Sequence, residues 1–266
     1  MTSSKNSKVI RMDYQEYKSV YNRLRSFGDI NRLIEEGYEE RFVKTLFTQK
    51  TSRDVKKRFY VVKQNTGRML KEWKKGKSMM DIAMKWNFPP ILTAMFIFLE
   101  DGASKKEFWG YVADPDLLRK EVADELKEVI ANDPVYSPEG NEEQRLRGIW
   151  GETLLQNWLN DQGIGYRTEN DLRGEYEKTP DALLDEPMLF EGKKIYWIES
   201  KASFGDNTEF KYNSRKQLIP YTNIFGPGVV VYWVGKLDDL ECPEGVTVQD
   251  ISILEKKLDR IETCEE

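Results

Sequence analysis

The segment "GPGVVVYWVG", residues 226–235, constrains the fold of this chain more than any other feature. It is a continuous apolar run with glycines at both ends, which is typical of a strand buried on both faces of its sheet. The stretches before it indicate an amphipathic helix in "EEQRLRGIWGETLLQNWLNDQG", strands in "IGYRT" and in residues 179–201, and a helix in "SRKQLIPYTNIF". Helix, strands, helix and buried strand together predict an α/β domain.

The first half of the chain is predicted to be helical up to about Phe108. Apolar side chains recur there at helical spacing, for example at Tyr14, Tyr17, Tyr21 and Leu24. Residues 132–143, "NDPVYSPEGNEE", contain two prolines and a glycine and are predicted to be a linker. We therefore expect a helical region over residues 1–131 and a second domain over residues 144–266.

Residues 77–102, "KSMMDIAMKWNFPPILTAMFIFLEDG", have the pattern of two helices with a tight break. Ser78 is a helix cap with Asp81 at the capping-box position, "NFPP" ends the first helix, and the second runs from about Ile91 to Leu99. This hairpin resembles a helix-turn-helix, whose second helix can enter a major groove. Because that helix has little polar surface with which to contact bases, a purely structural hairpin is the alternative.

The charges of the chain are segregated along its length. There are 41 Lys and Arg against 46 Asp and Glu, but residues 44–77 are basic and contain only two acidic residues, Asp54 and Glu72. Such asymmetry predicts a polyanionic partner, with a solvated helix face as the alternative. The residues expected to bind nucleic acid are Lys56, Lys57, Arg58, Arg68, Lys71, Lys74 and Lys75.

The chain contains no histidine, which narrows its chemistry. Catalysis by Ser-His-Asp or Cys-His groups and zinc held by histidine are excluded. Cys242 and Cys264 cannot form a disulfide framework, and no CxxC pair indicates zinc. The first 20 residues lack the apolar region of a secretion signal, and no run reaches membrane-spanning length, so a cytoplasmic protein is expected.

Three charges lie in the strands of residues 179–206, and strand periodicity predicts that they meet. In "IYWIESKAS", alternation places Ile195, Trp197, Glu199 and Lys201 on one face. Glu191-Gly192 is a plausible turn, which would form a hairpin and return Glu199 towards Asp181. A carboxylate and an ammonium in a half-buried strand are costly unless they are paired or bind a metal.

Two converging carboxylates and a lysine suit phosphodiester hydrolysis. Asp181 and Glu199 would each give one oxygen to Mg²⁺ or Mn²⁺, and the Ser200 carbonyl another. Lys201 would orient the attacking water or stabilise the transition state. The alternative is a Glu-Lys pair on an exposed strand, with Asp181 capping a turn; the D…ExK pattern alone does not exclude it.

The order of these residues resembles the PD-(D/E)XK nuclease superfamily. "PD…ESK" follows a helix that carries Glu152, and Gln217 and Tyr221 in "QLIPY" are similar to a Q-x-x-x-Y pattern of RecB-like members. The blocks "KTPDALLD", "WIESKASFGD" and "FGPGVVVYWVG" resemble the TPD-motif family, predicted nucleases shared by archaea and eukaryotes, among them the codanin-interacting nuclease. Eukaryotic members carry histidines beside the helical glutamate, where this chain has "IWGE".

The resemblance implies a restriction-endonuclease-like PD-(D/E)XK core, a mixed central sheet flanked by helices, after an all-helical region with the helix-turn-helix-like hairpin. It implies that Asp181, Glu199 and Glu152 bind Mg²⁺, that Lys201 is the catalytic cation, and that Gln217 and Tyr221 contact substrate or brace the site; for these last two, a helix packing face is the alternative. It also implies an archaeal source, DNA as substrate and a homodimer. The rival functions are a non-cleaving DNA-binding or regulatory protein on the same fold, a protein-interaction scaffold, and a metal-dependent phosphatase of small substrates, which would leave the basic region without a role.

Overall fold

The structure, a computed structural model, describes residues 9–261 and divides into two compact units. Unit 1 comprises Asp29–Leu46 and the described parts of Met1–Arg25 and Leu146–Glu266, and unit 2 comprises Ser26–Gly28 and Phe47–Arg145. Two long helices, α3 (Glu40–Lys63) and α9 (Pro138–Asp161), each contribute residues to both units. Cys264 and the first eight residues, on which part of the expectation about a secretion signal depends, lie outside the described range.

Unit 2 is helical and is built around α6. Besides parts of α3 and α9, it contains α4 (Thr66–Lys74), α5 (Met79–Trp86), α6 (Pro90–Glu100), α7 (Lys105–Ala113), the 3₁₀ turn η1 (Pro115–Leu117) and α8 (Lys120–Ala131). Ser78 caps α5 by accepting a hydrogen bond from the backbone N–H of Asp81 (3.0 Å), and Gly102 follows α6 in the left-handed conformation. The two predicted helices and their break are therefore confirmed.

The helix α6 is a core element and not a reading head. Seven of its residues are buried: Ile91, Thr93, Ala94, Met95, Phe96, Ile97 and Phe98. The buried carboxylate of Asp133 accepts hydrogen bonds from the backbone N–H groups of Ile91 (3.0 Å) and Tyr136 (2.8 Å), which fixes the start of α6. Since α6 has no exposed face for a major groove, the structural hairpin is the correct alternative.

No single helix among residues 9–261 is long and apolar enough to cross a membrane. The helices α5 and α6 reach that length and composition only as a pair, and the pair is bent by 112°. Most of α6 is buried inside unit 2.

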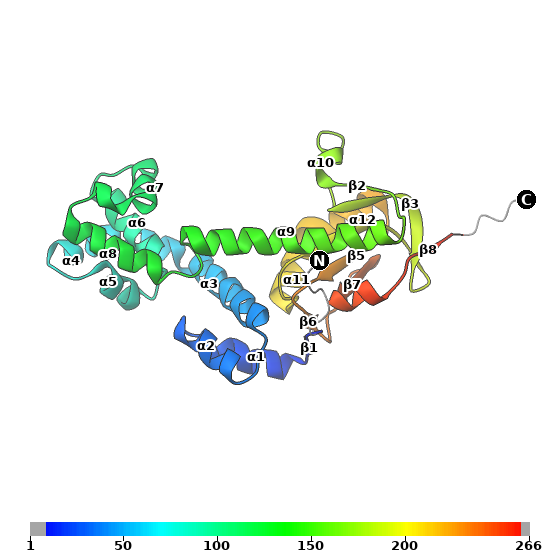
Figure 1. Ribbon diagram of the computed structural model, residues 1–266, viewed down its shortest axis with the longest axis horizontal. Helices are drawn as coiled ribbons and strands as arrows, with labels where there is room; N and C mark the ends of the chain where they lie inside the picture. Colours follow the sequence, from blue (N-terminus) through cyan, green and yellow to red (C-terminus); the bar gives the residue numbers. More distant parts are fainter. Residues whose placement is uncertain (1–8, 262–266) are drawn as a thin grey trace, which may run out of the picture. The chain divides into compact units, whose positions relative to one another are not determined.

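Unit 1 contains a six-stranded mixed sheet (Figure 1). Its order is β2 (Tyr166–Arg167), β3 (Ala182–Phe190), β4 (Lys193–Lys201), β5 (Gly228–Tyr232) and β7 (Val246–Asp250), with β8 (Asp259–Arg260) paired to β3. The pairs β2–β3, β3–β4 and β3–β8 are antiparallel, whereas β4–β5 and β5–β7 are parallel. All five residues of β5 are buried, as its sequence predicts.

Helices cover both faces of this sheet. One apolar cluster joins α9, through Leu155 and Trp158, to Ile198 and Val229 of the strands. The cluster on the other face joins α11 (Asn207–Asn213), the π-helical turn η2 (Ser214–Leu218) and α12 (Ile219–Phe225) to Trp197 and Val230. The mixed sheet flanked by helices is therefore confirmed.

Two glycines of the sheet have conformational or steric reasons to be there. Glu191 and Gly192 have φ of 50° and 76° and join Phe190 to Lys193 in a two-residue hairpin, as predicted. At Gly228, a Cβ would lie 2.2 Å from two ring atoms of the buried Trp197, so only glycine lets β5 approach β4 so closely. The hairpin and this contact fix β4, the strand that carries Glu199 and Lys201.

The alternation predicted for β4 is wrong at one residue. Trp197 faces α12, where its ring lies 5.4 Å from that of Tyr221, and Glu199 shares that face. Ile195, however, packs with Ile198 in the cluster that contains α9. The register between β3 and β4 shifts between Leu183 and Met188, so β3 is irregular opposite this part of β4.

Most of the described segment before α3 belongs to unit 1, whereas the sequence predicts one helical region over residues 1–131. The strand β1 (Arg11–Met12) pairs in parallel with β6 (Lys236–Leu237), and the helices α1 (Tyr14–Arg23) and α2 (Gly28–Glu35) follow. Arg11 forms an ion pair of 2.6 Å with the fully buried Asp250 at the end of β7. These long-range contacts, which no local pattern shows, attach the N-terminal segment to the sheet.

The aromatic side chains of this segment also hold the chain that follows β4. The Tyr17 hydroxyl donates to Asp206 (2.8 Å), and the ring of Phe204 stacks on Tyr17 at 5.7 Å. Asp206 caps α11 by accepting from the N–H groups of Thr208 and Glu209, at 2.9 Å each. The exit of the strand that carries Lys201 is thus fixed by α1.

The predicted linker of residues 132–143 is half helical. Pro138 begins α9, and the Ser137 hydroxyl accepts a hydrogen bond from the backbone N–H of Gly140 (3.0 Å), as a helix cap does. The proline stands in the first turn, where no helical hydrogen bond is lost. Only the part before Pro138 is a connection.

Candidate active site

The hairpin brings Asp181 beside Glu199 and Lys201. Asp181 immediately precedes β3, and the pairing of Ala182 with Ile198 places it next to the end of β4. The Asp181 carboxylate accepts from the backbone N–H of Ser200 (2.7 Å), while the backbone N–H of Asp181 donates to Glu199 Oε2 (3.2 Å). The predicted meeting of these charges is therefore present in the structure.

Glu199 and Lys201 form a buried ion pair. Lys201 Nζ lies 2.6 Å from Glu199 Oε1, and the Lys201 and Glu199 side chains are 19% and 2% exposed. This excludes the alternative of an exposed surface pair. Removing one partner of such a pair leaves an uncompensated charge in a poorly solvated place, so the loss of either side chain would destabilise the fold.

The electrostatics of the three groups are coupled. Burial, followed by the charge of Glu199, raises the pKa of Asp181 to about 7, and burial also raises the pKa of Glu199. Burial acts to lower the pKa of Lys201, but the charge of Glu199, its hydrogen bond and the charge of Asp181 outweigh burial and raise that pKa. The site therefore has a permanent ammonium and a carboxyl group that ionises near neutral pH.

Gln217 and Tyr221 brace this site from α12 and the π-helical turn before it. Gln217 Nε2 donates to Glu199 Oε1 (3.0 Å) and lies 3.3 Å from the Tyr221 hydroxyl. That hydroxyl donates to the carbonyl of Thr179 (2.8 Å), two residues before Asp181. Because Tyr221 is only 2% exposed, its contacts are with the protein. The π-helical turn allows Gln217 to reach the strand, a use that such turns often have near sites.

Ser200 and Glu152 occupy the opposite side of β4. The Ser200 hydroxyl accepts from the indole N–H of Trp233 (2.7 Å), and its backbone N–H is the one that binds Asp181. Glu152, on α9, is exposed, and its charge contributes to the raised pKa of Asp181. Glu152 thus influences the site through its charge.

The donor set can be compared with what a metal ion needs. Across residues 9–261, no group of three or more Asp, Glu, His or Cys side chains is placed to hold a metal ion. Asp181 and Glu199 are two hard oxygen donors at a buried place where their charges repel each other, which the pKa of Asp181 reflects. Mg²⁺ commonly takes one or two carboxylates and keeps several waters, so this pair fits it. The fit does not include Glu152.

Several of the predicted cations of unit 2 bind groups of the protein itself. Arg58 donates to the carbonyls of Trp86 and Asn87 (2.7 Å each), so it has a structural role at the end of α5. Lys57 and Lys74 have ion pairs, with Asp54 (3.7 Å) and Asp101 (2.6 Å) respectively. Six of the seven predicted cations are exposed, namely Lys56, Lys57, Arg68, Lys71, Lys74 and Lys75, and Arg58 is half-buried.

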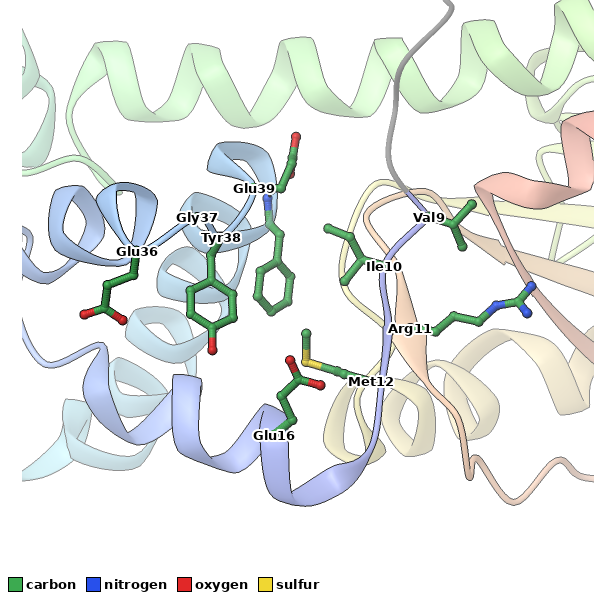
Figure 2. Close-up of a pocket in the computed structure, with 10 residues that line it drawn as sticks. Val9, Ile10, Arg11, Met12, Glu16, Glu36, Gly37, Tyr38 and Glu39 are labelled. Carbon is green, nitrogen blue, oxygen red and sulfur yellow. Dashed lines mark hydrogen bonds between the residues drawn. The ribbon is translucent and has the colours of Figure 1, made fainter.

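Two pockets of unit 1 are lined by residues other than Asp181 and Glu199. One of about 390 Å³ lies between β1, α1 and the start of α3, and Figure 2 shows Arg11 pointing away from it. Of its acidic residues, Glu36 pairs with Arg23, and Glu39 accepts from the backbone N–H of Phe42. The other pocket, of about 660 Å³, is bounded by α11, η2 and residues 239–243.

Three site residues were missed from the sequence: Thr179, Trp233 and Gly151. Thr179 acts through its backbone carbonyl, which no side-chain pattern can show. Trp233 follows the buried strand β5 and was assigned only to its apolar run, although a buried indole N–H usually needs an acceptor. Gly151 lies inside a helix, where an unexplained glycine can indicate close packing.

The chain is similar to known proteins over part of its length. A family model described as "protein of unknown function TPD sequence-motif" matches residues 118–252. Proteins named CDAN1-interacting nuclease 1 are 34% identical over 183 residues in Xenopus laevis and 35% identical over 173 residues in Homo sapiens. An uncharacterized protein of Acanthamoeba polyphaga mimivirus is 30% identical over 139 residues, which are 43% of this chain and 50% of that protein.

These matches are partial in length. They cover 65% of this chain and 60% of the Xenopus protein, and 62% of both this chain and the human protein. No solved structure matches. Because the family model spans half of the 266 residues and includes Asp181, Glu199 and Lys201, the chain belongs to the TPD-motif family.

Proposed function

We propose that this chain is a metal-dependent nuclease that hydrolyses phosphodiester bonds of DNA, on a core of the PD-(D/E)XK type. The observation that carries the proposal is the buried Glu199–Lys201 pair (2.6 Å) beside the Asp181 carboxyl group. A fold has little reason to keep three charges together at the end of a core strand unless they act on a ligand. The curated relatives with 34% and 35% identity are named nucleases, which supports the same activity.

In this proposal, Asp181 and Glu199 hold Mg²⁺ or Mn²⁺, with the Ser200 carbonyl as a third oxygen ligand. When bound, the metal makes a water molecule more acidic and neutralises charge on the phosphate. The buried carboxylate pair supports this role, because a divalent cation would offset both the burial and the repulsion by Glu199 that raise the pKa of Asp181 to about 7. Glu152 would act on the same ion from a distance.

The chain's own residues supply the remaining functions. Lys201, whose raised pKa keeps it protonated, would orient the attacking water or stabilise the negative charge that develops on the phosphate. Gln217 keeps the Glu199 carboxylate in place, and Tyr221 holds the loop before Asp181 through the Thr179 carbonyl. The turn η2 and the helix α12 would therefore preserve the geometry of both carboxylates.

Unit 2 would contribute phosphate contacts without sequence readout. Its exposed cations Lys56, Arg68, Lys71 and Lys75 lie on α3, on α4 and just after α4. Such contacts give affinity that falls steeply with salt. Since α6 is buried, preference among DNA molecules would come from their shape and strandedness.

The test is cleavage of a labelled panel that includes single strand, duplex, fork, flap, four-way junction and RNA. We expect cutting in Mg²⁺ or Mn²⁺, none in EDTA or Ca²⁺, and loss of cutting in Asp181→Asn, which keeps the shape of the side chain. Activity that survives EDTA would refute the metal dependence. Tight DNA binding without cutting of any substrate would favour the non-cleaving DNA-binding alternative.

Metal binding should depend on pH through Asp181. Below its pKa of about 7, a proton occupies the carboxyl group and competes with the metal, and above that pH the carboxylate is free. We therefore expect Mg²⁺ to bind about 10-fold more weakly at pH 6 than at pH 8, as measured by titration calorimetry. Asp181→Asn should lose this difference. Equal affinities at the two pH values in the wild type would contradict it.

A further inference from the structure

Arg41 lies against the face of an aromatic ring in unit 1. Its guanidinium carbon is 4.0 Å from the centre of the Trp150 ring. Arg41 belongs to the first turn of α3 and Trp150 to α9, and both side chains are half-buried. At this distance the cation is attracted to the ring face, and its planar group is held in one orientation.

Arg41 is one of the arginines of unit 1 that have no carboxylate partner among the described residues. Others are paired within 4 Å, for example Arg11 with Asp250, Arg32 with Asp29 and Arg167 with Glu175. Among residues 9–261, no carboxylate neutralises Arg41, which stacks on Trp150 instead. Its N–H donors are therefore available to an anion from outside the chain.

The stack is next to the candidate active site in the sequence of α9. Gly151 follows Trp150, and a Cβ at Gly151 would lie 3.2 Å from the Ser200 hydroxyl oxygen, so the helix touches β4 there. Glu152 comes next, and its charge affects the ionisation of Asp181. Trp150, on which Arg41 stacks, thus directly precedes the two residues of α9 that lie against Ser200 and influence Asp181.

We propose that Arg41, oriented by Trp150, binds a phosphate group of the nucleic-acid strand that lies in the active site. The proposal rests on the proposed function and adds a residue that the sequence did not indicate. A site with two carboxylates repels a polyanion, so a cation beside it is needed to hold the strand. Arginine suits this task, because its planar fork donates two parallel hydrogen bonds to a phosphate while its face stays on the ring.

The experiment measures the binding of a fluorescent DNA oligonucleotide in EDTA, which prevents cleavage, over a range of salt concentrations. Arg41→Ala should weaken binding about 10-fold at low salt and reduce the slope of log affinity against log salt by about 1. Arg41→Lys should keep the slope and recover part of the affinity, because the charge remains without the fork. Arg32→Ala, which removes an arginine already paired with Asp29, should change neither quantity.

Each outcome decides the proposal. If the wild type binds DNA and Arg41→Ala matches it in affinity and slope, the phosphate role is refuted while the proposed function stands. Weaker binding with an unchanged slope and a lower melting temperature would mean that Arg41 only stabilises the fold, which also refutes the proposal. If the wild type binds no nucleic acid, both the proposed function and this inference fall.

Discussion

Replacement of Lys201 by methionine should reduce cleavage by about 1,000-fold, since it removes the cation that is paired with the carboxylates of the site. It should also lower the free energy of unfolding by about 3 kcal/mol, because Glu199, 2% exposed, would keep its charge in the interior without a counterion. Methionine retains most of the aliphatic length of lysine, so the loss would not come from a cavity. Cleavage assays and urea denaturation measure the two effects.

The double variant Glu199→Gln with Lys201→Met separates stability from chemistry. Both charges are then gone, and the amide oxygen introduced by Glu199→Gln can still accept from one of the two donors that bind separate oxygens of Glu199, the backbone N–H of Asp181 or the amide of Gln217. We expect most of the lost stability to return, because replacing both members of a buried ion pair is often nearly neutral, and we expect no cleavage to return. A double variant as unstable as Lys201→Met would show that the loss of stability does not come from the unpaired charge of Glu199.

A second pair of variants lies three residues apart on α9. A Cβ at Gly151 would meet Trp233 Cδ1 at 2.7 Å and the Ser200 hydroxyl at 3.2 Å, whereas a Cβ at Gly148 would meet nothing within 4 Å. Gly148→Ala should therefore raise the free energy of unfolding by up to about 1 kcal/mol through helix propensity. Gly151→Ala should lower it by about 2 kcal/mol, because the buried indole has no room to move.

The same pair of variants also tests the site. The Trp233 indole donates to the Ser200 hydroxyl at 2.7 Å, so displacing it disturbs the residue whose backbone N–H binds Asp181. Cleavage by Gly151→Ala should be at least about 10-fold slower, a loss of about 1.4 kcal/mol of transition-state stabilisation, while Gly148→Ala keeps the wild-type rate. Denaturation curves and rates are compared side by side. Equal stabilisation by both alanines would disprove the close contact at Gly151.

The sequence predicts the structure correctly where the determinants of that structure are local. The turn at Glu191-Gly192 and the apolar run of β5 are complete within a few residues, so the hairpin and the meeting of Asp181 with Glu199 could be predicted. The start of α9 was also locally encoded, by Ser137 and Pro138, but the proline and the nearby Gly140 led to the prediction of a linker. One pattern there supports two structures, and tertiary packing decides between them.

Other features depend on contacts that sequence spacing does not show. The strand β1 has two residues, and its partner Lys236 lies at the other end of the chain, so nothing local indicates that the N-terminal segment joins unit 1. The apolar sequence of α6 is compatible with either a DNA-reading helix or a structural hairpin, and the burial of its residues favours the structural hairpin. The stack of Arg41 on Trp150 also joins distant segments, since each residue alone looks like an ordinary helix position.

The parallel pairing of Arg11 with Lys236 sets an order of events during synthesis. The first strand has no partner until Lys236 has left the ribosome, whereas Phe47–Arg145 of unit 2 is continuous and can collapse earlier. In that interval the buried aromatic side chains of Tyr17 and Phe42 lack Phe204, the residue that covers them. These aromatic side chains therefore stay uncovered until the later residues emerge, and slow translation before residue 236 would prolong their exposure.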